Sequence, residues 1–204
     1  MRVEPATPGW LDNRFHLQFR ELLVHACVRE RLSCPVYCLM PDHLHLLWLG
    51  LARASDQLNG MKFLRTYLNR LLARVPFQRR EHKHGEEKEA AVFGRTQPQE
   101  TAAFSRTPPR WRLQPQAFDH VLREEERRHD AFARVCFYIV ANPVRAALVL
   151  CEADWPFIGA VVPGYPDLHP LSEGYWDLFW RLCEELRDVP PSPDSRPGAA
   201  NYEA

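Results

Sequence analysis

Two histidines stand one residue apart in an otherwise apolar stretch, residues 38–50, which reads CLMPDHLHLLWLG. In a β-strand the side chains alternate between the two faces, so His43 and His45 would share one face and Leu44 would take the other. Two imidazoles on one strand face supply half of the ligands of a metal site. The alternative, which the spacing leaves open, is a pair of surface or core histidines.

A tyrosine and an asparagine four residues apart, Tyr138 and Asn142, form the second candidate group. On a helix this spacing places both side chains on one face. A tyrosine can act as a covalent nucleophile, and an asparagine oxygen can bind a metal or position a substrate. Two other interpretations stay open: Tyr138 as a core aromatic, and Asn142 as a helix N-cap followed by Pro143 at the first helical position.

The sequence around these residues predicts both strands and helices, which must position them. Apolar residues at helical or alternating spacing indicate the type of each segment. The order predicts an α+β fold of the ferredoxin-like, split βαβ kind, with an antiparallel sheet. Residues 15–32 predict a helix, although its start at Phe15–Phe19 also fits a strand. A hairpin of strands 34–40 and 43–50 follows, and then a helix with a leucine stripe, capped by Ser55. The remaining predicted elements are an extended segment within 110–123, a helix at 124–142 and an amphipathic helix from about Glu173.

One domain is expected over residues 15–188, after an irregular N-terminus at 1–14 and before a disordered tail at 189–204. Within that domain, residues at about 76–109 are charged and lack periodicity, which indicates a long insert. Residues 53–112 hold thirteen Arg and Lys against six Asp and Glu, a net charge of +7 in a chain whose total is zero. Basic regions favour phosphate. The DNA-contact candidates are Lys62, Arg65, Arg70 and Arg145.

The composition indicates a soluble, cytoplasmic protein. No apolar run approaches the roughly 18 residues that a membrane span needs, and the first residues have no hydrophobic core of a secretory signal. The six cysteines lie mostly in apolar contexts without a Cys-x-x-Cys pair, so we expect them to be reduced and mainly buried.

Three ordered motifs carry a resemblance to a known family. The segment YCLMPDHLHLLWLG (37–50) resembles the signature of the single-tyrosine HUH transposases, and YIVANPVRAALV (138–149) resembles their nucleophile helix. The subgroup that is most similar is that of the REP-associated tyrosine transposases, which also share a stretch like FDHVLREEE (118–126). Together the motifs cover about half of the chain.

The resemblance implies a metal-dependent enzyme that nicks and rejoins single-stranded DNA, in transposition or recombination. It implies that His43 and His45 hold a divalent metal, Mg or Mn, that Asn142 completes the metal site, and that Tyr138 attacks the scissile phosphate. The DNA partner would carry hairpins. We expect a monomer, with a dimer as the alternative.

Two departures from the family pattern set the alternatives. The family fold opens with a strand that pairs beside the histidine strand, and the sequence leaves open whether this chain retains that strand. In the expected fold, the helices cover one face of the sheet. The insert at about 76–109 also replaces a compact connection. The alternative function is therefore a domesticated or decayed protein that binds DNA hairpins without cleaving them. A structural zinc site is disfavoured, because such sites normally need four ligands.

Overall fold

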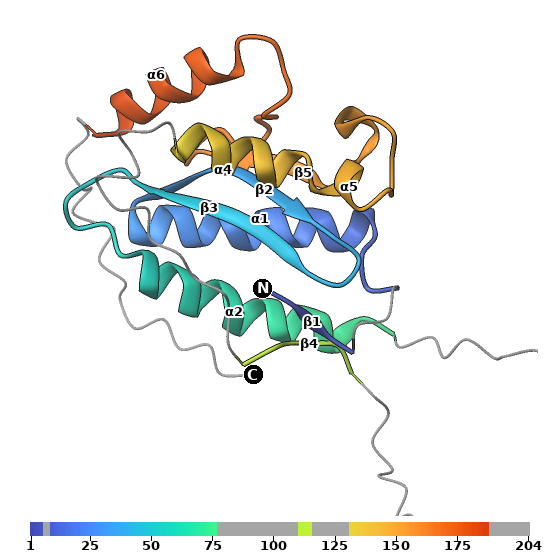
Figure 1. The fold of residues 1–204 in the computed structure, drawn as a ribbon. Coiled ribbons are helices and arrows are strands. Elements are labelled where there is room, and N and C mark those ends of the chain that lie inside the picture. Colours follow the sequence, from blue (N-terminus) through green and yellow to red (C-terminus); the bar gives the residue numbers. More distant parts are fainter. Residues whose placement is uncertain (6–8, 77–109, 116–130, 188–204) are drawn as a thin grey trace, which may run out of the picture.

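The structure, a computed structural model, describes residues 1–5, 9–76, 110–115 and 131–187 (Figure 1). Its helices and strands, in chain order, are β1 (Val3–Glu4), α1 (Asn13–Glu30), β2 (Leu32–Leu39), β3 (Leu44–Gly50), α2 (Gln57–Arg74), β4 (Arg112–Leu113), α4 (Ala131–Val140), α5 (Asn142–Arg145), the 3-10 helix η1 (Glu152–Asp154), β5 (Ile158–Val161) and α6 (Tyr175–Arg187).

The strands pair antiparallel, as the sequence predicts. β2 lies between β3 and β5, and β1 pairs with β4. An antiparallel bridge from Arg2 to His43 joins the two groups of strands. The resulting order is β4-β1-β3-β2-β5. β3 thus separates β1 from β2, and β1 separates β3 from β4, which is the interleaving of a split βαβ fold.

The first strand of the fold is present, although the sequence left this open and predicted an irregular N-terminus. The backbone N–H of Val3 donates to the carbonyl of Asp42 at 2.7 Å, and the N–H of Leu44 donates to the carbonyl of Met1 at 2.7 Å. β1 spans only two residues. A strand that short has no alternation to detect, so only its hydrogen bonds reveal it.

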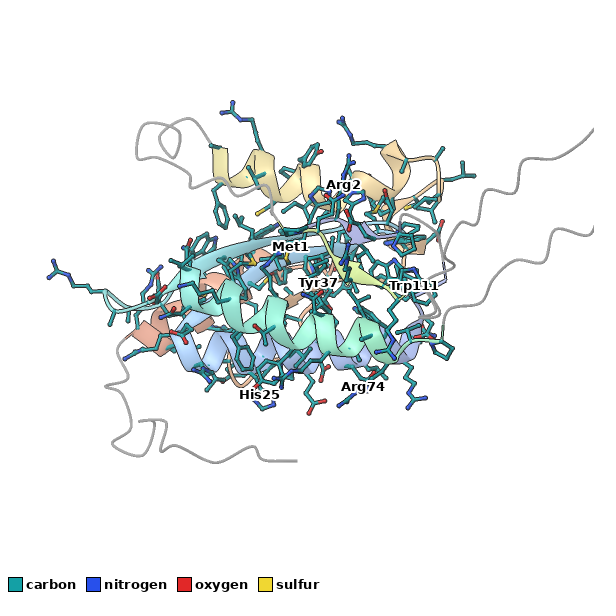
Figure 2. The ribbon with its side chains drawn as sticks, turned by 90° about the horizontal axis from the view of Figure 1, so that it is seen from below. Met1, Arg2, His25, Tyr37, Arg74 and Trp111 are labelled. Atoms are coloured by element: carbon teal, nitrogen blue, oxygen red, sulfur yellow. The ribbon has the colours of Figure 1, made fainter. Side chains whose placement is uncertain are left out.

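The expectation of helices on one face of the sheet is wrong. α1 and α2 cover one face, whereas α4 and α6 lie on the other (Figures 1 and 2). The reason lies in β2, where all eight residues are buried. Its Tyr37 packs toward α1 and α2, and its Cys38 packs toward α4. A strand that is apolar on both faces needs cover on both.

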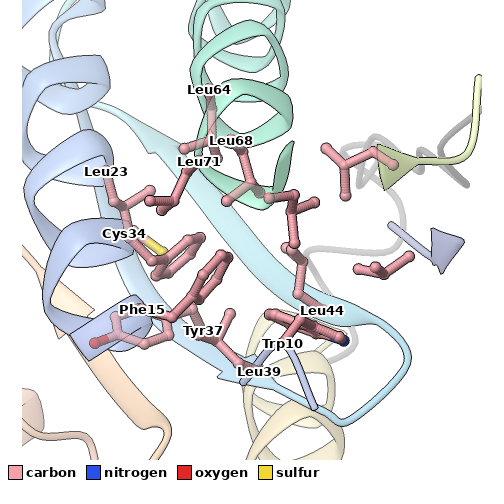
Figure 3. Packing of buried hydrophobic residues seen from close by; sticks show 14 of the residues in the cluster. Trp10, Phe15, Leu23, Cys34, Tyr37, Leu39, Leu44, Leu64, Leu68 and Leu71 are labelled. Atoms are coloured by element: carbon pink, nitrogen blue, oxygen red, sulfur yellow. The ribbon is translucent and has the colours of Figure 1, made fainter. Parts of the chain in front are cut away.

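α1 is helical throughout, so the alternative of a strand at Phe15–Phe19 is wrong. The Asp12 carboxylate caps the helix by accepting the N–H of Phe15 at 2.7 Å. Phe15, Phe19 and Leu23, at four-residue intervals, are buried against the sheet, while Leu17 is exposed. Figure 3 shows Phe15 and Leu23 in the core that α1 forms with α2 and the sheet.

α2 follows the predicted leucine stripe. Leu64, Leu68 and Leu71 are buried in the same core (Figure 3). The cap differs by one residue from the prediction, because Asp56 rather than Ser55 accepts the N–H of Asn59, at 2.8 Å.

β5 was not predicted from the sequence, because it lies in a segment rich in Trp, Pro and Gly. β5 pairs with the buried β2, and its Ala160, together with Val162 directly after the strand, packs against α6. α6 begins at Tyr175, two residues after the predicted start, and the Tyr175 hydroxyl donates to the carbonyl of Pro35 at 2.5 Å. This hydrogen bond connects α6 to the first half of β2.

The cysteines behave as predicted: all six are free, and five are buried, with Cys151 exposed. None of the helices in the described ranges is long and apolar enough to cross a membrane. The 118–126 motif, the tail at 189–204 and, apart from Pro76, the insert at about 76–109 lie outside the described residues.

Candidate active site

The two histidines share one face of β3, as the alternation predicts. Leu44, between them, is 1% exposed and belongs to the core under α1 and α2. The rings of His43 and His45 lie on the other face, with their centroids 4.7 Å apart and their planes nearly perpendicular. Both imidazoles therefore face the side of the sheet that α4 covers.

A carboxylate fixes the orientation of the first imidazole. Nδ1 of His43 lies 2.7 Å from Oδ1 of Asp42. When Nδ1–H donates to this carboxylate, the lone pair of Nε2 is left for another partner. Histidines that bind metals commonly have such a carboxylate behind them. Sequence reasoning missed the role of Asp42, although an acidic residue directly before a candidate ligand was a visible signal.

The second imidazole is held neutral with an unused nitrogen. Burial lowers the pKa of His45 to about 4, and the nearby His43 and the chain's amino group act in the same direction. Its Nε2 atom is buried and has no hydrogen-bond partner within the described structure. Leaving a buried polar atom unpaired costs about 1–3 kcal/mol. A neutral imidazole with a free nitrogen is the form that binds a metal.

Tyr138 reaches the same place from α4. One side of α4, including Cys136 and Ile139, packs on β2 next to Cys38, and Cys38 is the cross-strand partner of His45. The ring of Tyr138 meets the ring of His45 edge to face, with centroids 5.8 Å apart. Tyr138 is 46% exposed, so its interpretation as a core aromatic is wrong. The geometry leaves this phenol accessible beside the two imidazoles.

Asn142 is 8% exposed and turns its side-chain amide back onto the preceding helix, α4. Its Nδ2 donates to the carbonyl of Tyr138 at 2.7 Å. The N-cap interpretation is not what the structure shows, because Ala141 precedes α5 and no side chain caps that helix. With the nitrogen engaged, the oxygen is the atom of Asn142 that could serve as a ligand.

The residues present fit a divalent metal held by imidazole. His43 is oriented by a carboxylate, and His45 offers a buried nitrogen that nothing in the described structure occupies. No cluster of three or more His, Cys, Asp or Glu side chains within the described ranges could hold a metal. The protein would therefore supply two imidazoles and at most the Asn142 oxygen, and substrate or water oxygens would complete the shell.

Of the four basic candidates, the structure brings one to the site. The guanidinium carbon of Arg145 lies 5.2 Å from the ring centroid of Tyr138. Lys62, Arg65 and Arg70 are on α2, which covers the opposite face of the sheet. Arg65 donates to the carbonyl of Gln114 at 2.6 Å, so this side chain ties α2 to the segment after β4.

The comparisons with known proteins add no relative. Neither the family models, nor the curated proteins, nor the solved structures contain a match to this chain.

Proposed function

We propose that the protein is a transposase-like enzyme that nicks and rejoins single-stranded DNA through Tyr138 with the help of a divalent metal. The observation that carries the proposal is the edge-to-face approach of Tyr138 to His45, 5.8 Å between centroids, beside the paired ring of His43. These residues come from two separate motifs of the sequence. Their convergence is what a metal-assisted attack on a phosphodiester requires.

The proposed reaction is a transesterification. Oη of Tyr138 attacks the scissile phosphorus, a bond from phosphorus to the tyrosine oxygen forms, and the bond to the 3′ oxygen of the leaving strand breaks. The phenolic proton passes to solvent, and the departing oxygen takes up a proton to become a 3′-OH. The products are a 5′-phosphotyrosine and a free 3′-OH. No oxidant, reductant or nucleotide cofactor is consumed, so the reverse attack rejoins a strand.

The side chains around Tyr138 have distinct parts in this scheme. Asp42 keeps the His43 ring in one orientation, and burial keeps His45 neutral at pH 7. A metal bound there, Mg or Mn, would polarise the phosphate. Arg145, above the Tyr138 ring, offers a positive charge to the phosphate oxygens. The exposure of Tyr138 allows a DNA strand to reach it.

The test is the formation of a covalent adduct. Protein is incubated with Mn or Mg and hairpin-bearing single-stranded oligonucleotides, and the adduct is detected by denaturing electrophoresis and mass spectrometry. The adduct should form with the wild type and vanish in Tyr138→Phe. A matched control is Tyr165→Phe, because Tyr165 is 45% exposed but lies in the loop after β5. An adduct that persists in Tyr138→Phe shows that the nucleophile is another residue.

The alternative function, a protein that binds DNA hairpins without cleaving them, predicts a different outcome. The possible absence of the first strand was one reason for this alternative, and β1 is present. Binding without an adduct under any divalent metal would favour the alternative. If the wild type binds no single-stranded DNA at low salt, both functions are rejected.

A further inference from the structure

Arg2 lies directly opposite His43, where the residue before β1 pairs with the residue before β3. The two residues form an antiparallel bridge, and backbone hydrogen bonds of 2.7 Å flank it on both sides, from Val3 to Asp42 and from Leu44 to Met1. Because these bonds join the neighbours of the pair, Arg2 and His43 form a non-hydrogen-bonded pair. In such pairs the Cβ atoms stand about 4.5–5.5 Å apart on the same face.

The alternation of the first strand sends Arg2 to the face of the candidate active site. Val3, the next residue, is 1% exposed and packs into the core under α1 and α2. Arg2 therefore points to the opposite face, where it is exposed. Figure 2 shows Arg2 on the side of α4 and α5, whereas Arg74 lies on the α2 side.

The charge of Arg2 is not neutralised within the described structure. Arg2 makes no ion pair there. Of the carboxylates that adjoin it in the strand pairing, Asp42 bonds to His43 at 2.7 Å and Glu4 pairs with Arg112 at 3.4 Å. Arg145 likewise faces a ring, that of Tyr138, and no carboxylate in the described residues. Two guanidinium groups that form no ion pair in the described residues thus lie beside the two imidazoles, which favours an anion between them.

We propose that Arg2, together with Arg145, binds the scissile phosphodiester of single-stranded DNA, Arg2 from the strand pairing beside His43 and Arg145 from α5 beside Tyr138. The inference rests on the proposed function and adds a substrate-binding residue that no motif of the sequence indicates. A guanidinium presents two parallel N–H donors to phosphate oxygens, a geometry that a lysine cannot reproduce.

The test measures DNA binding in the absence of metal, so that it does not depend on cleavage. Fluorescence anisotropy with a labelled, hairpin-bearing single-stranded oligonucleotide is recorded in EDTA over a range of salt concentrations. Each lost phosphate contact should reduce the slope of log K against log [salt] by about 0.7. The variants are Arg2→Ala, Arg2→Lys and, as matched control on the opposite face, Arg74→Ala.

Arg2→Ala should weaken binding about tenfold at low salt and reduce the slope by about 0.7, whereas Arg74→Ala should change neither. Arg2→Lys should keep the slope but bind more weakly than the wild type. A thermal melt checks that the backbone pairing of β1 survives in each variant. If Arg2→Ala binds with wild-type affinity and slope, the inference is wrong.

The binding test of Arg2 can fail or succeed independently of the proposed nicking activity. If the wild type binds DNA through Arg2 but never forms an adduct, the nicking activity fails and the binding site stands. If the adduct forms and vanishes in Tyr138→Phe, yet Arg2→Ala binds normally, the activity stands and the role of Arg2 is refuted. Equal losses in Arg2→Ala and Arg74→Ala would also refute it, because they indicate only a general effect of positive charge.

Discussion

Replacing His45 by alanine removes an imidazole whose Nε2 atom is buried without a hydrogen-bond partner in the described structure. A histidine that serves only the core would lose packing on this replacement, with destabilisation of about 1–3 kcal/mol. A histidine kept for a metal behaves differently. Its unpaired nitrogen costs about as much as its packing contributes, so the metal-free variant should unfold within about 1 kcal/mol of the wild type.

Addition of the metal should raise the Tm of the wild type but not that of His45→Ala. A ligand that binds only the folded state at one hundred times its dissociation constant stabilises that state by about 2.7 kcal/mol. For a domain of this size, that free energy corresponds to a rise in Tm of about 5–10 °C. The wild type should show this rise when Mn is added after chelation, and His45→Ala should show little of it.

The assay is thermal unfolding followed by circular dichroism, with and without Mn. His25→Ala is the matched control, because His25 is exposed on α1, away from the site (Figure 2). This control should respond to Mn as the wild type does. A wild type that gains no stability from Mn or Mg, together with a His45→Ala variant that melts several degrees earlier in chelator, would show that this imidazole is structural and not a metal ligand.

Three further predictions concern side chains at and around the sheet. Asp42→Asn should lower the affinity for Mn by about 10–100-fold, because the carboxylate orients the neighbouring imidazole; isothermal titration calorimetry would measure it, and an unchanged affinity would speak against that role. His16 bonds to Tyr37 at 2.9 Å, and burial, aided by Arg20, lowers its pKa to about 4. Since the unfolded chain has a pKa near 6.5, this site contributes fully to stability above that pH and its contribution is lost as pH falls toward 4. Partial exposure reduces the effect to about 1–2 kcal/mol, and urea unfolding at pH 7 and pH 5 should reveal it, with a flatter profile in His16→Gln. Gly159→Ala should destabilise the fold by about 1–3 kcal/mol, because its Cβ would overlap the Tyr37 hydroxyl and ring; an unfolding free energy equal to that of the wild type would contradict this packing.

Local pattern was enough to predict several parts of the molecule. The alternation around Leu44 placed His43 and His45 on one face, and the structure agrees. The leucine stripe predicted α2, and the motif around Tyr138 predicted a helix there. Each of these features depends on side chains within one element, where the period of the backbone decides which residues share a face.

Other features depended on which segments meet. The basic residues Lys62, Arg65 and Arg70 looked like DNA contacts by charge, but α2 covers the face opposite Tyr138. Charge along a chain does not state which side of a sheet a helix will cover. That choice followed from β2, whose residues are buried on both faces and so required helices on both.

The site itself was assembled by non-local pairing. Tyr138 lies beside His45 because α4 packs on Cys38, the cross-strand partner of His45. Arg2 lies beside His43 because the residues at the start of β1, a strand of two residues, pair with the segment before β3. Such a strand has no periodicity, and its register is set by backbone hydrogen bonds to a segment about forty residues away. The sequence alone determined which residues are candidates for the chemistry, and the tertiary pairing decided which of those candidates lie together.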